Sequence, residues 1–161
     1  EDFFILGEET DLAWRVWLSG WRVVFEPMAI GYHAFNTKFK PMEKHYNSER
    51  VQYNGSRNYI TMLLKNLEAK SLWKILPFHI LVWFSAGCAM VGTLKLRQGY
   101  NIFRGLWYVI YHWKYIMRKR KQVQFKRIPT DKELWPYIYL KPPRGYYTQR
   151  FFRYLSIGLH G

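Results

Sequence analysis

Acidic side chains are concentrated at the beginning of the chain, where they could accept a proton or bind a metal ion. Five of the eleven acidic residues fall within the first eleven positions, although the whole sequence carries a formal charge of +14. Like charges this close repel one another and disfavour ionisation. A helix N-terminus, an arginine, a metal ion or a substrate proton must therefore compensate Glu8, Glu9 and Asp11.

His33 is a second candidate for chemistry. Residues 28–34 alternate in the manner of a strand, which places Ala29, Gly31 and His33 on one side. The two small residues would leave room for a ligand beside the imidazole ring. A core histidine with one satisfied hydrogen bond is the plainer interpretation of the same pattern.

The acidic segment is expected to continue as a helix over residues 8–19. Its acidic first turn is favoured by the backbone dipole, and Asp11 and Arg15 form an i, i+4 pair in the favourable order. Gly20 is the predicted end of this helix. Its apolar residues recur at helical spacing, and they are Leu12, Ala13, Val16 and Trp17.

Two short strands are expected next, over residues 22–25 and 28–34, with Pro27 ending the first of them. A long polar-to-amphipathic helix should follow over residues 42–68. It contains Arg57, for which the plain interpretation is a solvated or phospholipid-facing arginine.

The second half of the chain combines apolar, aromatic and basic residues. Residues 80–93 carry no charge, but this run is short for a hydrocarbon core about 30 Å thick. Residues 102–117 predict an amphipathic helix that ends in the basic run 118–121. An apolar face, an aromatic border and basic residues are typical of a helix in the membrane interface. A helical hairpin packed on its own domain is the alternative.

The overall composition fits more than one kind of partner. The sequence is 20% aromatic and contains 25 Lys and Arg residues. Such a mixture suits a membrane interface, a nucleic-acid surface or a basic globular domain. Residues 130–134 predict a short capped helix within an otherwise irregular end.

The segment from Phe3 to His33 resembles the C-terminal part of the catalytic domain of family 2 glycosyltransferases, which are inverting enzymes of the GT-A fold. The matching residues, in order, are Phe3-Phe4-x-x-Gly7-Glu8-Glu9-x-Asp11-Leu12-x-x-Arg15, then Gly20-Trp21, Pro27 and His33. A weaker similarity continues through Arg50, Arg57-Asn58 and Lys65, and again from Lys119 to Leu134.

This resemblance implies a mostly helical α/β fragment: the end of a GT-A, Rossmann-like domain, with a helix and two short strands, followed by long amphipathic helices. Residues 1–68 would be the acceptor-side, C-terminal part of that domain. Residues 69–128 would form a membrane-facing amphipathic helical hairpin, and residues 129–161 an irregular tail. We expect the nucleotide-binding half to lie upstream of Glu1, so that this fragment alone would be inactive.

The resemblance also assigns roles. Glu9 would be the general base, with Glu8 and Asp11 keeping the local field negative. His33 would complete the coordination of a divalent cation, Mn²⁺ or Mg²⁺, that is held mostly by residues outside this chain. Arg57 would contact the diphosphate leaving group.

The function implied is transfer of a hexosyl or deoxyhexosyl group, with inversion, from a nucleotide-sugar donor to a lipid-linked or cell-surface glycan acceptor. The expected location is the cytoplasmic face of the cell membrane, either peripheral or single-pass, on an anionic surface. A non-enzymatic basic module that binds anionic membrane or nucleic acid is the alternative, although no nucleic acid is expected as a partner of the enzyme.

Overall fold

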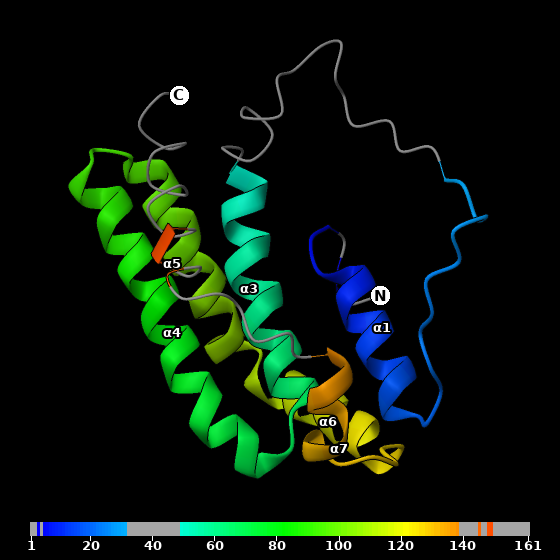
Figure 1. The fold of residues 1–161 in the computed structure, drawn as a ribbon. Coiled ribbons are helices and arrows are strands. Elements are labelled where there is room, and N and C mark those ends of the chain that lie inside the picture. Colours follow the sequence, from blue (N-terminus) through cyan, green and yellow to red (C-terminus); the bar gives the residue numbers. More distant parts are fainter. Residues whose placement is uncertain (1–2, 4, 32–48, 139–144, 146–147, 150–161) are drawn as a thin grey trace.

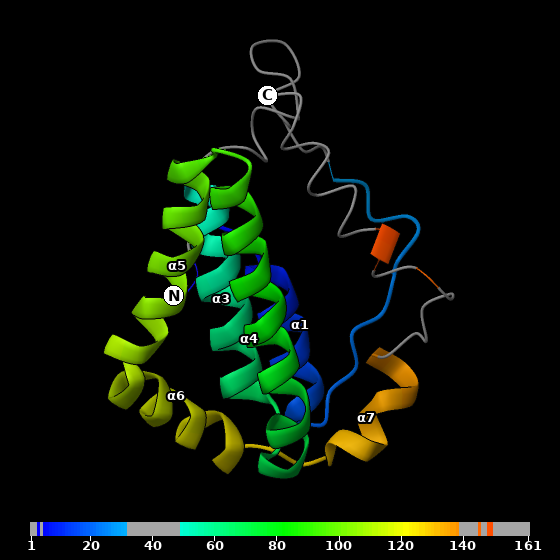
Figure 2. The same cartoon turned by 90° about the vertical axis from the view of Figure 1, so that its left-hand side faces the viewer.

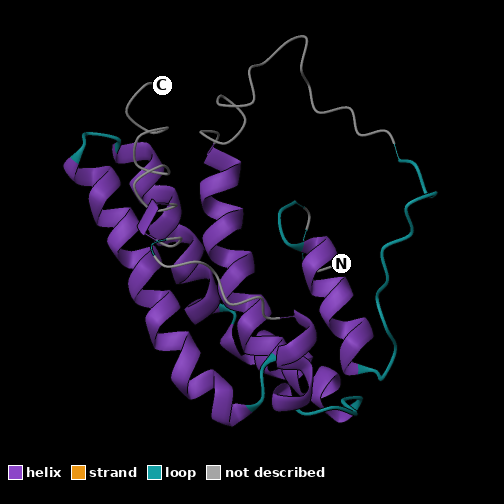
Figure 3. Cartoon of the chain, in the orientation of Figure 1, coloured by secondary structure: helices purple, strands orange, loops and turns teal. Residues whose placement is uncertain are grey.

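The computed structural model describes residues 3, 5–31, 49–138, 145 and 148–149 (Figure 1). Helices account for most of these residues, and no strand occurs among them (Figure 3). The main helices are α1 (Glu8–Leu18), α3 (Glu49–Asn66), α4 (Ala69–Gly92), α5 (Leu96–Tyr111), α6 (Trp113–Phe125) and α7 (Asp131–Ile138).

The prediction of an α/β fragment with two short strands is therefore wrong. Residues 22–25 and 28–31 form a loop that leaves the helical body (Figure 1), and residues 32–34 lie outside the described residues. The apolar side chains of this loop are exposed, Phe25 to 89%. An alternating pattern becomes a strand only when a neighbouring strand supplies hydrogen-bond partners. No part of the chain that the structure describes supplies one.

Helix α3 is the centre of the fold. It packs against α5, α6, α4 and α1, and Figure 2 shows α3, α4 and α5 side by side with α1 behind α3. The main core combines buried residues of α3, α5 and α6, and a second cluster joins α4 to α5. The buried core residues are Ile60, Leu64, Val109 and Ile116, with Ala86, Met90 and Ile102 in the second cluster.

Helices α3 and α5 approach closely because Gly105 has no side chain. A Cβ at this position would overlap the Ser56 hydroxyl and lie 2.6 Å from the Tyr53 carbonyl oxygen. Ser56 is fully buried and donates a hydrogen bond to the Ile102 carbonyl at 3.1 Å. The Tyr53 carbonyl and the Ser56 hydroxyl therefore fix this contact. The hydroxyl cannot move aside without losing its hydrogen bond to Ile102.

Gly105→Ala should destabilise the protein by about 1–3 kcal/mol or more, because the extra methyl group forces α3 and α5 apart. The matched control is Gly92→Ala, since a Cβ at Gly92 meets no atom within 4 Å. Thermal unfolding followed by circular dichroism measures both. Equal stability of the two variants would contradict the close packing of α3 on α5.

Helix α1 begins and ends almost where the sequence predicts. It ends at Leu18, and Gly20 follows with a φ of +81°. The Gly20 amide donates to the Trp17 carbonyl at 3.0 Å, and the Trp21 amide to the Val16 carbonyl at 3.2 Å. This pair of hydrogen bonds is a Schellman motif, so the prediction of Gly20 as the helix end is confirmed.

The predicted helix over residues 102–117 is divided between α5 and α6. His112 lies between them, and the Tyr108 carbonyl accepts the His112 amide at 2.9 Å. The His112 ring lies over the Tyr108 ring, with centroids 3.8 Å apart. The helical spacing of the apolar residues continues from α5 into α6. The sequence pattern therefore does not show that the helix is interrupted at His112.

The short helix predicted at residues 130–134 is present as the start of α7. The Thr130 amide donates to the Glu133 carboxylate at 2.7 Å, and the Glu133 amide donates to the Thr130 hydroxyl at 3.3 Å. These reciprocal hydrogen bonds form a capping box. The bond from the Thr130 amide, and after it that from the Thr130 hydroxyl, lowers the pKa of Glu133.

Helix α4 is the one helix among the described residues that is long and apolar enough to cross a membrane, judged by length and composition alone. Its mean hydropathy over 18 residues is 1.7, and most of that window is exposed. Trp73, Leu81 and Phe84 are among its exposed side chains. These properties are compatible with membrane association.

Candidate functional site

The acidic pair lies at the first turn of α1. Glu8 and Glu9 are both exposed, and within the described part of the chain neither carboxylate has a hydrogen-bond or ion-pair partner. Carboxylates at a helix N-terminus are stabilised by the backbone dipole, which alone accounts for acidic residues here. The same position leaves both side chains exposed.

Asp11, one turn further on, is in a different environment. It is only 2% exposed, and its Oδ2 accepts from Arg15 Nε at 2.9 Å and from Lys65 Nζ at 3.2 Å. Its Oδ1 accepts from Asn66 Nδ2 at 2.9 Å. The predicted pair of Asp11 with Arg15 is thus confirmed. A buried carboxylate with three donors holds α1 against the end of α3.

The turn before α1 is also held by α3. Asn58 Nδ2 donates to the carbonyl oxygens of Ile5 and Leu6, both at 2.8 Å. Leu6 and Gly7 have φ angles of +69° and +86°, and a left-handed leucine is an uncommon, strained conformation. Asn58 therefore fixes the backbone immediately before the acidic pair.

A cavity of about 610 Å³ lies between α1, the end of α3 and α6. Glu8, Asp11 and Arg15 line it from α1, Lys65 from α3, and Lys119 from α6. The remaining lining residues are Phe3, Leu18, Ser19, Gln122, Val123 and Lys126. Glu9 is not among them, so the two acidic neighbours differ: Glu8 borders the cavity, and Glu9 lies on the adjacent face of the helix.

Arg57 lines a second cavity, of about 270 Å³, together with Thr61, Tyr108, His112 and three other residues, which are Phe3, Tyr115 and Ile116. Its guanidinium group lies 5.1 Å from the centre of the Tyr108 ring, and its Nε donates to Asn58 Oδ1 at 2.8 Å. Arg57 is thus held between aromatic rings. Phe3 borders both cavities, but the structure does not bring Arg57 to the wall of the larger one.

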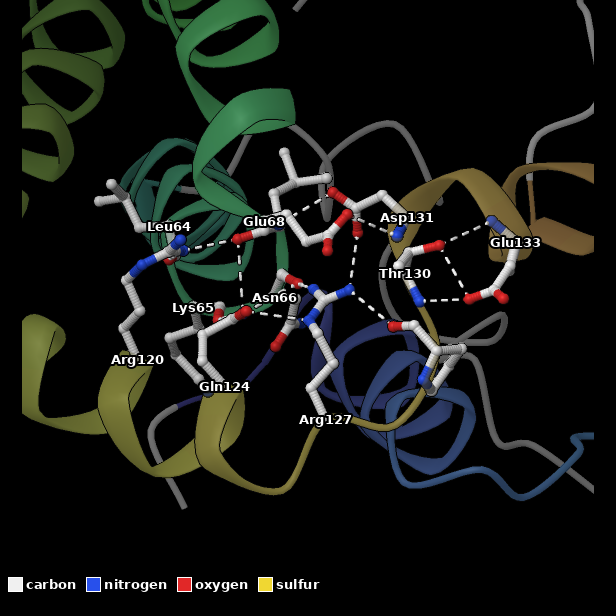
Figure 4. A network of polar contacts seen from close by, with 12 residues as sticks. Leu64, Lys65, Asn66, Glu68, Arg120, Gln124, Arg127, Thr130, Asp131 and Glu133 are labelled. Carbon is white, nitrogen blue, oxygen red and sulfur yellow. Dashed lines mark hydrogen bonds and ion pairs between the residues drawn. The ribbon is translucent and has the colours of Figure 1, made fainter.

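The last carbonyl groups of α3 are closed by side chains from the region after α5 (Figure 4). Arg120 donates to two of them, Gln124 Nε2 to two others at 2.9 and 3.2 Å, and Arg127 to one of the two carbonyls that Gln124 also contacts. The acceptors are the carbonyls of Leu64, Lys65, Asn66 and Leu67. Cationic donors suit a helix C-terminus. Burial, followed by the charge of Arg127, lowers the pKa of Arg120.

The same network ties α7 to the start of α4. Asp131 Oδ2 accepts from the Glu68 amide at 2.8 Å, and Glu68 Oε2 accepts from the Asp131 amide at 2.8 Å. Arg127 pairs with Asp131 Oδ1 at 3.0 Å, and both side chains are buried (Figure 4). Residues 119–134 therefore both contact the end of α3 and contribute Lys119 and Lys126 to the lining of the larger cavity.

The predicted metal ligand, His33, lies outside the described residues. Within the ranges 5–31 and 49–138, no group of three histidine, cysteine or acidic side chains could hold a metal ion. The roles predicted for Glu8, Glu9, Asp11, Arg57 and the cation stay predictions.

Sequence reasoning did not predict the contacts by which residues of α3 position the acidic segment. Asn58, Lys65 and Asn66 contact residues more than 50 positions earlier in the chain. Their spacing of seven and eight residues puts them on one helix face. The available signal was this row of polar side chains on a helix that also has an apolar face. It could have indicated that the polar face contacts another part of the chain.

Comparisons with known proteins identify no relative. No family model, no curated protein and no solved structure matches this chain. The resemblance to family 2 glycosyltransferases therefore depends on the matched residues alone.

Proposed function

We propose that this chain forms the acceptor-side part of an inverting glycosyltransferase that uses a nucleotide-sugar donor. The observation that carries the proposal is the pair of accessible carboxylates, Glu8 and Glu9, on a helix held in place by buried polar contacts. A general base must be accessible to its substrate and fixed in position. Asp11 and Asn58 fix the helix and the turn before it, and Glu9 stays accessible.

The proposed reaction is a single displacement. The acceptor hydroxyl attacks the anomeric carbon of the donor sugar, the bond from that carbon to the diphosphate breaks, and Glu9 accepts the hydroxyl proton. A divalent cation, Mn²⁺ or Mg²⁺, would stabilise the charge that develops on the diphosphate. Residues outside this chain would hold the donor and most of the cation's coordination shell, with His33 as one further ligand.

Membrane association on the cytoplasmic side forms the second part of the proposal. Helices α4 and α5 present large exposed apolar side chains, which include Phe84, Trp107 and Ile110. Arg118 and Lys121 on α6 are exposed and basic, as expected for contact with an anionic leaflet. Arg120 does not belong to this surface, because its guanidinium group binds carbonyls of α3.

Replacing Arg118 and Lys121 with glutamine should weaken binding to vesicles that contain phosphatidylserine by about 2 kcal/mol, at about 1 kcal/mol for each basic residue near the surface. Sedimentation with vesicles at several salt concentrations measures this change. The matched control, Arg22 and Lys132 to glutamine, removes the same charge from the loop after α1 and from α7. Equal weakening by both pairs would mean that net charge, and not α6, determines binding.

The enzymatic function is tested by supplying radiolabelled nucleotide-sugars, one at a time, to membranes that contain the protein of which this chain is part. Label from one donor should appear in a lipid or glycan fraction. Failure of every donor, together with intact vesicle binding, would favour the alternative function, a basic membrane-binding module in which Glu8 and Glu9 only stabilise the start of α1.

A further inference from the structure

We propose that α4 and α5 lie flat on an anionic lipid bilayer through one continuous apolar surface, and that α4 does not cross the membrane. This inference rests on the membrane association in the proposed function, because it names the surface and its orientation. Helix α4 has 24 residues, which makes it about 36 Å long at 1.5 Å per residue. It is long enough to cross a hydrocarbon core about 30 Å thick, so its length does not decide between the two orientations.

The apolar surface combines one stripe of side chains from each helix. Residues three or four positions apart share a helix face. On α4 the stripe consists of the exposed residues Trp73, Pro77, Leu81, Phe84, Cys88 and Val91. On α5 it consists of Leu96, Tyr100, Phe103, Trp107 and Ile110, all exposed except the half-buried Phe103. The Phe84 and Phe103 rings meet edge to face with centroids 5.5 Å apart, so the two stripes form one surface.

The helices beside α4 carry charge at the level of its uncharged part. Residues 75–94 contain no lysine, arginine or acidic residue, and α3 and α5 lie beside α4 (Figure 2). A Cβ at Gly87 would lie 2.7 Å from the Phe103 ring, so this part of α5 is level with the uncharged part of α4. The next residue, Arg104, is exposed, and its guanidinium group lies 4.4 Å from the centre of the Tyr53 ring.

Helix α3 has the same property. A Cβ at Gly55 would lie 3.2 Å from the Trp83 ring of α4. Arg50 is exposed and lies five residues earlier, which is about 7.5 Å along the helix axis. If α4 crossed the bilayer, α3 and α5 would cross with it, because the three helices share buried cores. Arg50 and Arg104 would then lie at the depth of the lipid tails, where an exposed guanidinium group is costly.

A flat orientation keeps these charges out of the hydrocarbon. Helix α3 contacts Trp83 of α4 and Gly105 of α5, and the helical spacing places both residues away from the apolar stripes. The body of α3, with Arg50, therefore lies on the side of the hairpin opposite to the lipid. Arg104 is close to the edge of the surface, and its long side chain can extend to the headgroups.

The residues beside the surface fit a bilayer in particular. Lys70 and Lys74 are exposed near the start of the α4 stripe, where they can contact anionic headgroups. Trp73 and Trp107 are 82% and 64% exposed, and tryptophan is enriched at the boundary between water and lipid. Aromatic rings in an apolar stripe with basic residues beside it are typical of a helix that lies in the membrane interface.

Labelling of cysteines from one side of the membrane tests the orientation. Cys88 is the one cysteine of the sequence. Lys74→Cys and Lys95→Cys, each combined with Cys88→Ser, therefore place a single thiol at either end of the uncharged part of α4. A membrane-impermeant maleimide is added to sealed membrane vesicles from cells that express the protein, before and after detergent. Both thiols should behave alike, because both ends of α4 lie on the same side. If one thiol reacts at once and the other only after detergent, α4 crosses the membrane and the inference is overturned.

The native Cys88 tests the contact with lipid. Its side chain is exposed, and it carries a nitroxide label in this experiment. On binding to vesicles of phosphatidylcholine and phosphatidylserine, the label should lose accessibility to a water-soluble nickel chelate and gain accessibility to oxygen. The matched control places the label at Lys132→Cys with Cys88→Ser, on an exposed position of α7, where nickel accessibility should not change.

The remaining outcomes separate this inference from the proposed function. A Cys88 label that stays accessible to nickel on bound vesicles would overturn the inference, because lipid would not cover the surface. Protection of the label without vesicles would also overturn it, since a second copy of the chain would then cover the surface. Failure to bind vesicles would overturn both the inference and the proposed membrane association. Neither assay contains a nucleotide-sugar, so a failure of sugar transfer leaves these results unchanged.

Discussion

Glu9→Gln is expected to lower turnover about 10²-fold or more in the complete enzyme, while the affinity for the nucleotide-sugar donor stays the same. The amide has almost the same shape as the carboxylate but cannot accept the acceptor's proton during attack on the anomeric carbon. The loss should therefore affect the chemical step and spare ground-state binding. Turnover at saturating donor and calorimetric donor binding separate these two quantities.

Glu8→Gln is the matched control for this prediction. It removes the same charge from the same first turn of α1, and so it repeats the loss of charge–dipole stabilisation, which is about 0.3–1 kcal/mol. A much smaller loss of turnover is expected, because Glu8 is not the proposed proton acceptor. Near-normal turnover of Glu9→Gln would exclude Glu9 from the mechanism. Glu8 and Glu9 would then only stabilise the N-terminus of α1.

Asp11→Ala should cost about 3–5 kcal/mol of stability, which is the second large effect expected. Asp11 and Lys65 are both buried, with side-chain exposures of 3% and 5%. Removing Asp11 takes a counter-ion away from the buried Lys65 ammonium group, in a medium that solvates charge poorly. Asn66 would also lose the acceptor of its amide hydrogen bond. Urea unfolding measures the change in the free energy of unfolding.

Arg15→Ala provides the comparison for Asp11. Arg15 contacts the same Asp11 oxygen as Lys65, but its side chain is 42% exposed. Water can replace much of such a contact, so a loss of less than about 1 kcal/mol is expected. If the two variants unfold at the same urea concentration, Asp11 does not act as the buried anchor of α1.

Local features of the fold were predictable from the sequence. The first turn of α1, its end at Gly20, the pair of Asp11 with Arg15, and the capping box from Thr130 to Glu133 all depend on residues fewer than six positions apart. Such signals act through backbone geometry and side-chain reach, which a short window of sequence contains.

Features that depend on distant partners were not predictable in this way. Residues 22–25 were predicted as a short strand, but the described chain offers no second strand to pair with. The run 118–121 resembles one basic surface, but Arg120 turns inward to the end of α3 while Arg118 stays exposed. The position of a side chain on a helix, and what lies opposite it, decides its role.

The position of the acidic segment belongs to the same class of feature. Lys65 and Asn66 lie 54 and 55 residues after Asp11, and only the packing of α1 on α3 brings them together. Without these partners the carboxylates form a plain acidic cluster. With them, Asp11 is assigned to structure, and Glu8 and Glu9 are the two exposed carboxylates at the start of α1.

The anomeric configuration of the product tests the proposed mechanism most directly. Once the donor and acceptor are identified, NMR of the product gives the coupling constant of the anomeric proton of the transferred sugar. Base-assisted single displacement by the acceptor hydroxyl predicts the configuration opposite to that of the donor. It also predicts about 10²-fold less of this product from Glu9→Gln at the same enzyme concentration and reaction time. Retention of the donor's configuration would contradict the account, because a single displacement assisted by Glu9 cannot produce it.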